Sequence, residues 1–192
     1  MSHILYSATC VKVGKDQRPY LDAKLTVVCE TLGVKKPELY LSSGSTVNAF
    51  TGGVDRHFIV LYSSLVQSMT DMELLAVLAH EVGHIHCQHM LYKVAADLLL
   101  FVVFKFGMST PLGPLLNTLG LPVMIALASW RHKAELSCDR SALLVTQDDK
   151  VVMSALMKLA GGLKDLNLDA FIEQARAFDK NNGFGDLRNR CP

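Results

Sequence analysis

The feature that most constrains this chain is the motif His80-Glu81-Val82-Gly83-His84, which ends a long apolar run. Residues four apart lie on one face of an α-helix, so His80 and His84 can direct both imidazoles at one metal ion. Glu81 lies beside them, where its carboxylate can reach a metal-bound water rather than the metal itself. The motif therefore predicts a helix that carries part of a zinc site.

A start signal upstream supports this helix. The sequence Thr70-Asp71-Met72-Glu73 has the pattern of a capping box, in which the first and last side chains satisfy free backbone N–H groups at a helix N-terminus. Nothing breaks the apolar pattern before Gly107, so we expect the helix to continue past His89 to about Phe106.

Two histidines leave a catalytic zinc site incomplete, because such a site usually takes three protein ligands and one water. His86 points to another face of the helix, and His89 does so too unless the helix breaks there. Glu135 is a better candidate on a second predicted helix, with Asp139 one turn later on the same side. An aspartate there could orient a ligand histidine. On spacing alone, a solvent-exposed acidic helix face explains the pair equally well.

Apolar spacing and turn signals predict the other helices and strands. Further helices are expected at about 19–32, 129–145, 150–163 and 168–180. Three short strands are expected at 38–42, 48–51 and 57–62, and they would form a small sheet lying over the metal-binding helix. Residues 1–16 show no strong period and suggest an N-terminal arm or loop, and 181–192 read as a mobile tail. The 192 residues suit a single domain, 1–192.

The segment 98–130 allows two interpretations. It contains no charged residue between Phe106 and Trp130, yet Lys105 and several prolines interrupt its apolar runs. A membrane-spanning helix needs about 20 apolar residues. We therefore favour a buried helical hairpin, and the alternative is a hairpin that is embedded in a membrane or contacts one.

Composition excludes some partners and compartments. The formal net charge of +1 gives no electrostatic reason to expect nucleic-acid binding. Five dispersed cysteines suggest a reducing compartment without a disulfide framework. The N-terminal residues show no secretion signal. These features favour a cytoplasmic protein, membrane-associated if the 98–130 hairpin meets lipid.

Several motifs together resemble a known family, the M48 metallopeptidases, which include the HtpX and Ste24 types and the small soluble minigluzincins. His80-Glu81-Val82-Gly83-His84 resembles their zinc helix, and Glu135-Leu136-Ser137-Cys138-Asp139-Arg140 is similar to their Glu-x-x-x-Asp-Arg motif. Asn48-Ala49-Phe50 is similar to the strand that precedes their active-site helix. The resemblance covers roughly Tyr20 to Phe178.

The resemblance implies a predominantly helical α+β fold with a zincin-like (gluzincin) core. That core would hold a small three-stranded sheet over the His-Glu-x-x-His helix, an apolar helical hairpin and a glutamate helix. It also implies one Zn²⁺ per chain, bound by His80, His84 and Glu135. Glu81 would be the general base on a zinc-bound water, and Asp139 would fix His80.

The implied activity is that of a zinc-dependent metalloendopeptidase that hydrolyses peptide bonds of proteins. A protein or peptide substrate would lie along Asn48, Ala49 and Phe50 by strand addition. The chain departs from the family pattern because no His-Pro segment follows the glutamate helix, and the donor for the oxyanion stays unassigned. The candidates for that donor are His57, His132, Arg140 and Arg176. The alternative is a non-catalytic zinc-binding interaction or quality-control module on the same fold.

Overall fold

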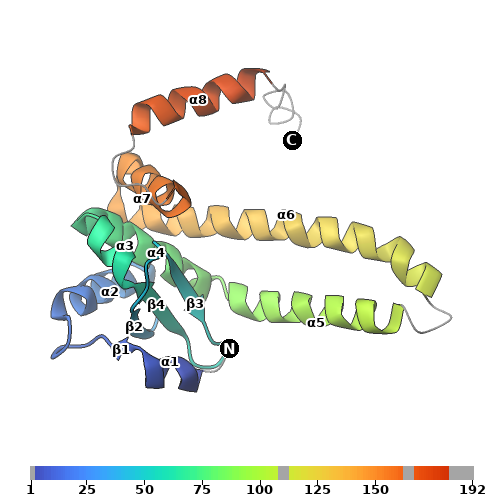
Figure 1. Ribbon diagram of the computed structural model, residues 1–192, viewed down its shortest axis with the longest axis horizontal. Coiled ribbons are helices and arrows are strands. Elements are labelled where there is room, and N and C mark those ends of the chain that lie inside the picture. Colours follow the sequence, from blue (N-terminus) through green and yellow to red (C-terminus); the bar gives the residue numbers. More distant parts are fainter. Residues whose placement is uncertain (1–2, 108–112, 162–166, 182–192) are drawn as a thin grey trace.

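The computed structural model describes residues 3–107, 113–161 and 167–181. Helices surround a small sheet, and a long two-helix arm projects to one side (Figure 1). The helices are α1 (His3–Thr9), α2 (Pro19–Leu32), α3 (Ser63–Ser68), α4 (Asp71–His86), α5 (His89–Gly107), α6 (Gly113–Thr146), α7 (Asp149–Gly161) and α8 (Leu168–Asn181). The strands are β1 (Val11–Lys12), β2 (Glu38–Ser42), β3 (Ala49–Gly52) and β4 (Phe58–Tyr62).

The sheet has four strands in the order β1-β2-β4-β3, where three were expected. The three predicted strands are present, and β2 runs parallel to β4 while β3 pairs antiparallel with β4. The extra strand, β1, has two residues and pairs with β2 near Leu41. It lies in the predicted N-terminal arm, which also contains α1. A two-residue strand is too short for an alternating pattern, and only its pairing with β2 defines it.

The metal-motif helix α4 begins at the predicted capping box. The Thr70 backbone N–H donates to Glu73 Oε2 at 2.7 Å, and the Thr70 hydroxyl accepts from the Glu73 N–H. Most of α4 is buried, with Leu78, Ala79 and Val82 fully enclosed between the sheet, α2, α6 and α7. Burial on nearly every side explains why its sequence is almost continuously apolar.

The prediction of one continuous helix to about Phe106 was wrong. α4 ends at His86, and α5 begins at His89 on a different axis. Gln88 has φ 54°, in the left-handed region that non-glycine residues adopt only at a cost of about 1–2 kcal/mol. Neither glycine nor proline marks this break in the sequence. The break turns the chain into α5, which packs on α6.

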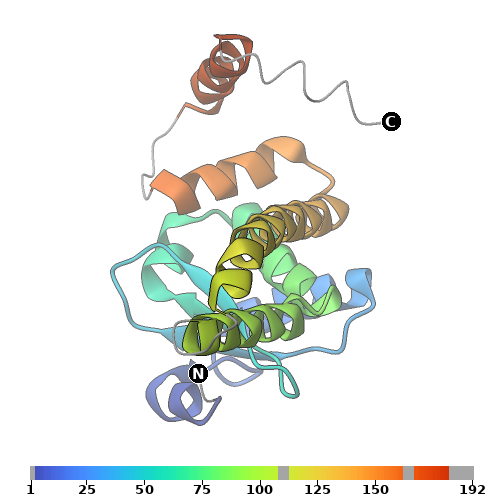
Figure 2. The ribbon, with the colours of Figure 1, turned by 90° about the vertical axis from the view of Figure 1, so that its right-hand side faces the viewer.

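The arm formed by α5 and α6 also differs from the expected buried hairpin. α6 spans 34 residues and continues through Pro122, so the helix expected at 129–145 is only its second half. Pro122 removes one backbone hydrogen bond without ending the helix. Figure 2 views the two helices along the arm. Among the residues of the arm whose side chains are described, the large apolar ones are mostly exposed, with Phe101 at 58% and Ile125 at 59%. The expected burial is therefore wrong for these residues, and residues 108–112 of the hairpin lie outside the described part of the chain.

None of the helices in the described part of the chain is long and apolar enough to cross a membrane.

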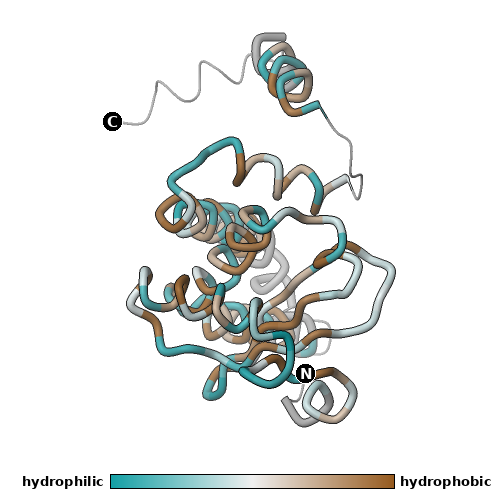
Figure 3. The backbone as a smooth tube through the Cα atoms, turned by 90° about the vertical axis from the view of Figure 1, so that its left-hand side faces the viewer, coloured by the Kyte–Doolittle hydropathy of each residue, from teal (hydrophilic) through white to brown (hydrophobic). Residues whose placement is uncertain are grey.

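The last two helices were predicted to within two residues. α7 packs against α4, where Lys158 Nζ lies 2.8 Å from Glu73 Oε2. α8 stands apart from the sheet and alternates hydrophilic and hydrophobic residues (Figure 3). The predicted tail, 181–192, lies outside the described residues beyond Asn181.

Candidate metal centre

The centre forms where α4 and α6 pack closely, and Gly83 permits that approach. A Cβ added at Gly83 would lie 3.1 Å from Cys138 Cα and 2.9 Å from Ser141 Oγ, both on α6. Side chains of ordinary size at this position would push α6 outward. The glycine therefore sets the distance between the histidines of α4 and the acids of α6.

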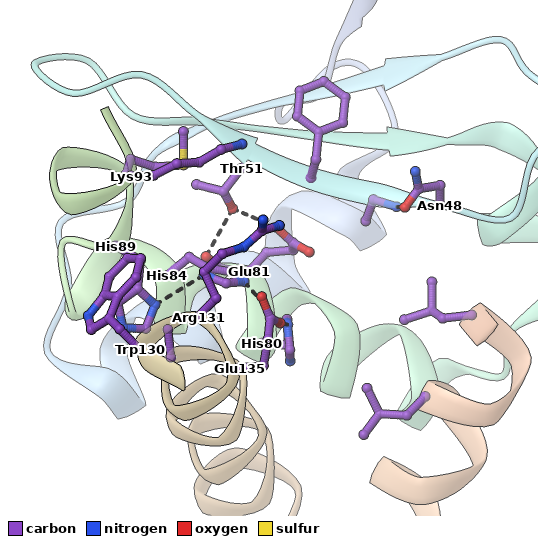
Figure 4. Close-up of a pocket in the computed structure, with 16 residues that line it drawn as sticks. Asn48, Thr51, His80, Glu81, His84, His89, Lys93, Trp130, Arg131 and Glu135 are labelled. Atoms are coloured by element: carbon purple, nitrogen blue, oxygen red, sulfur yellow. Dashed lines mark hydrogen bonds and ion pairs between the residues drawn. The ribbon is translucent and has the colours of Figure 1, made fainter. Parts of the chain in front are cut away.

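The three predicted ligand residues converge. Glu135 Oε2 lies 3.3 Å from His80 Nε2 and 3.7 Å from His84 Nε2 (Figure 4). Ligands bound tetrahedrally at about 2.1 Å from zinc would be about 3.4 Å apart. The spacing and chemistry of these donor atoms therefore fit a zinc ion.

Asp139 lies on the far side of the His80 ring. Its Oδ1 is 3.0 Å from His80 Nδ1, which leaves the other ring nitrogen, Nε2, facing Glu135. Burial lowers the pKa of His80, but hydrogen bonds to Asp139 and Glu135 outweigh it and raise the pKa to about 9. The surroundings of His80 therefore stabilise positive charge at this point.

Glu81 is buried beside these groups and lines the cavity in front of them. Thr51 Oγ1 donates to Glu81 Oε2 at 2.7 Å and lies 3.0 Å from the Glu81 backbone oxygen. Burial raises the pKa of Glu81, and the Thr51 hydrogen bond and His80 oppose that rise. The contact joins β3 to α4 across 30 residues of sequence, so no local spacing could have identified Thr51.

Cys138 is a second candidate for the third ligand. Potential ligand atoms of His80, His84 and Cys138 all lie within 4.8 Å of one another. However, Cys138 is fully buried, and burial raises the pKa of its thiol, whereas metals bind the thiolate. A hydrogen bond from His80 lowers the pKa of Glu135, whose side chain is 58% exposed. Glu135 is the better ligand on both grounds.

A cavity of about 420 Å³ opens in front of this centre. β3 and the residue before it form one wall, where the predicted substrate-binding residues Asn48, Ala49 and Phe50 all line the cavity. The base of the arm forms the opposite wall. A peptide could therefore enter between the edge strand and the arm.

The positively charged side chains that line this cavity are not the ones considered from sequence as oxyanion donors. Lys93 of α5 and Arg131 of α6 line it, and Figure 4 shows Lys93 on the side of the strands, away from the histidines. None of the four residues considered from sequence lines the described cavity, and His57 instead contacts the Gly53 backbone oxygen at 3.0 Å. Arg131 stands four residues before Glu135, one helical turn away. That spacing could have identified it.

Comparisons with known proteins point to one peptidase family. The model for peptidase family M48 matches residues 15–178. Over 181 residues the chain is 41% identical to the plastoglobule-localized metallopeptidase 48, chloroplastic, of Arabidopsis thaliana, covering 90% of this chain and 50% of that protein. It is 24% identical over 179 residues to protease HtpX homolog 2 of Methanosarcina mazei, covering 82% of this chain and 60% of that protein. The chain thus spans 50–60% of the length of these relatives.

Proposed function

This chain belongs to peptidase family M48, and from that premise we propose that it is a zinc-dependent metalloendopeptidase acting on proteins. The observation that carries the proposal is the convergence of His80, His84 and Glu135, which would hold the ion. A zinc ion there would polarise the scissile carbonyl and lower the pKa of a water molecule.

Glu81 is proposed as the general base. It would accept a proton from the attacking water and pass it to the leaving amine. Its support is geometric, because it lines the cavity beside the ligand histidines and its carboxylate receives a hydrogen bond from Thr51. Thr51 would keep the carboxylate in one orientation and leave the other oxygen available for the proton.

The substrate backbone is proposed to pair with β3. This strand is the last in the order of the described sheet, and Ala49 and Phe50 line the cavity. Adding a strand at a sheet edge supplies main-chain hydrogen bonds that hold an extended peptide without regard to its sequence. A protease bound in this way would accept varied unfolded segments.

Arg131 is proposed as the group that stabilises negative charge on the scissile carbonyl oxygen. It lines the cavity one helical turn from Glu135. A preorganised donor of this kind lowers the barrier because charge develops there only in the transition state. Replacing Arg131 by alanine should lower kcat about 10-fold or more, whereas Arg140→Ala, whose side chain does not line the described cavity, should not. Equal rates for the two variants would remove Arg131 from this role.

The arm is proposed to rest against lipid. Its support is the exposure of Leu98, Phe101 and Ile125, together with the plastoglobule-localized name of the Arabidopsis relative. The protein should float with phospholipid vesicles in a density gradient, and a Phe101→Ser/Ile125→Ser variant should float much less. A wild-type protein that stays at the bottom would contradict this proposal. A cytoplasmic location remains a prediction.

The decisive experiment pairs metal content with cleavage of an unfolded protein such as casein. We expect about one zinc per chain, loss of cleavage on chelation and recovery on adding zinc. Cleavage by protein shown to be metal-free would overturn the proposal. Zinc-loaded protein that leaves every unfolded substrate uncut would favour a non-catalytic zinc module on the same fold.

A further inference from the structure

We infer that His89 is a positioning residue that accepts a hydrogen bond from His84 and so fixes which nitrogen of His84 faces the metal. The inference rests on the proposed zinc function, because it assigns His84 as a ligand. His84 Nδ1 lies 3.1 Å from His89 Nδ1, and His89 is only 9% exposed. His89 was set aside from sequence because it lies off the ligand face of a continuous helix.

The contact between two Nδ1 atoms constrains where the protons sit. A hydrogen bond needs one N–H and one bare nitrogen, so the two rings cannot both carry a proton on Nδ1. His84 Nε2 faces Glu135 at 3.7 Å and must be bare to bind a metal. His84 therefore carries its proton on Nδ1, and His89 is neutral with its proton on Nε2.

A contact from Cys138 is compatible with the same assignment. Its Sγ lies 3.5 Å from His89 Nδ1. A thiol S–H is a weak donor, so it can also point at a bare Nδ1 of His89.

The backbone is shaped to bring His89 into this position. On a continuous helix, five residues advance about 500°, so the His89 side chain would point about 140° away from that of His84. The left-handed Gln88, with φ 54°, ends α4 and restarts the chain as α5. The break therefore has a chemical consequence, since it returns His89 to the ligand face.

Packing then holds the His89 ring. Its plane stands at 90° to the Trp130 ring, with ring centroids 5.9 Å apart. Trp130 belongs to α6, which also carries Glu135, so the ring that orients His84 is braced by the same helix that supplies the third ligand. The two ligand histidines thus have different partners: a carboxylate for His80 and a neutral imidazole for His84.

The test compares three variants of the purified full chain by zinc affinity in chelator competition. His89→Leu removes the acceptor, and we expect zinc binding to weaken about 10–100-fold, the usual effect of losing a group that orients a ligand. His89→Asn places a carbonyl oxygen near the former Nδ1 position and should restore most of the affinity. His86→Ala is the matched control, because His86 lies on the same turn of α4 as His84 but is exposed.

A second measurement does not require zinc. Nitrogen-15 spectra of the metal-free protein should show His84 protonated on Nδ1 and His89 on Nε2, with the His84 signal changed in His89→Leu and unchanged in His86→Ala. His84 protonated on Nε2, or equal zinc affinities for His89→Leu and His86→Ala, would overturn the inference. A wild type that binds no zinc would overturn the proposed function instead, while the spectra would still decide the role of His89.

Discussion

Helix α4 carries two buried glutamates in opposite surroundings. Glu73 is 4% exposed and Glu81 is 7% exposed, so burial does not distinguish them. Glu73 accepts hydrogen bonds from Lys158 at 2.8 Å, Ser154 at 2.6 Å and the Thr70 backbone at 2.7 Å. Glu81 receives one from a side chain, Thr51, at 2.7 Å.

The two carboxyl groups differ in pKa for this reason. Burial raises the pKa of Glu73, but the hydrogen bonds from Lys158, Ser154 and Thr70 outweigh it, and the net shift is downward. Burial also raises the pKa of Glu81, and there the opposing contacts are too few to reverse it. The number of hydrogen-bond donors therefore distinguishes the two acids. Glu73 is held as a carboxylate that joins α4 to α7, whereas Glu81 keeps a raised pKa, as expected of a group that takes up a proton.

The largest expected effect comes from Glu81→Gln. Loss of the general base should lower the rate of proteolysis about 10²–10⁴-fold, because a neutral amide cannot take up a proton at this position. Casein cleavage measures the rate, and zinc content and the melting temperature should stay at wild-type values. If the variant still cleaves at the wild-type rate, another group transfers the proton. Glu81 would then not differ from Glu73 by a catalytic role.

The matched change at the other acid is Glu73→Gln, which should affect folding instead. Removing this charge leaves Lys158, whose side chain is 14% exposed, without its carboxylate partner. Breaking a buried ion pair from one side costs about 3 kcal/mol, which denaturant unfolding would detect. The cleavage rate per folded molecule should not change. Lys158→Met and the double variant measure how much of the cost belongs to the pair itself.

Thr51→Val sharpens the comparison by removing the side-chain donor to Glu81 with little change in shape. We expect a loss of about 1.5 kcal/mol in transition-state stabilisation, or roughly a 10-fold lower kcat, since a hydrogen bond to a charged carboxylate contributes at least that much. Single-turnover cleavage would measure it, with Thr46→Val as the control, because Thr46 does not line the described cavity. If kcat is unchanged while KM rises, Thr51 holds the substrate strand rather than the base.

The smallest effect is a pH dependence of stability. Because the folded pKa of Glu73 lies below its ordinary value of 4.5, its stabilising contribution is present above about pH 4.5 and is lost as the pH falls through the lowered value. The difference in unfolding free energy between wild type and Glu73→Gln should therefore shrink between about pH 5 and pH 3. A difference that stays constant over this range would mean that the charge of Glu73 does not stabilise the fold.

Local patterns predicted much of the fold. The helix 19–32 and the strand 38–42 match α2 and β2 to the residue, and the capping box located the start of α4. Each of these signals lies within one element or at its end. Periodicity and caps were therefore sufficient, because the forces that define these elements act between near neighbours.

Two of the failures share a different cause. The break at Gln88 leads into α5, which packs on α6, and β1 is defined by its pairing with β2. No local window of sequence contains these contacts, so tertiary packing decided both features. The continuity of α6 through Pro122 is a third departure from the local signal.

The candidate site divides in the same way. The spacing of His80 and His84 follows from helix geometry alone. The role of Asp139 came from the family resemblance. Asp139 is 59 residues from His80, and its spacing alone fitted a solvent-exposed acidic helix face equally well. Thr51 was missed because its contact with Glu81 spans 30 residues of sequence. Arg131 was missed although it stands one helical turn before Glu135, and both residues line the cavity.

Gly83 has a consequence for protein design. The five-residue motif is usually written with two free positions, yet a Cβ at the second of them would here lie 3.1 Å from Cys138 Cα, on the helix that brings Glu135 and Asp139. A designer who transplants only the two histidines and the glutamate into a new helix would carry over the chemistry without the spacing that completes it. The smallest transferable unit is two helices in contact at a glycine.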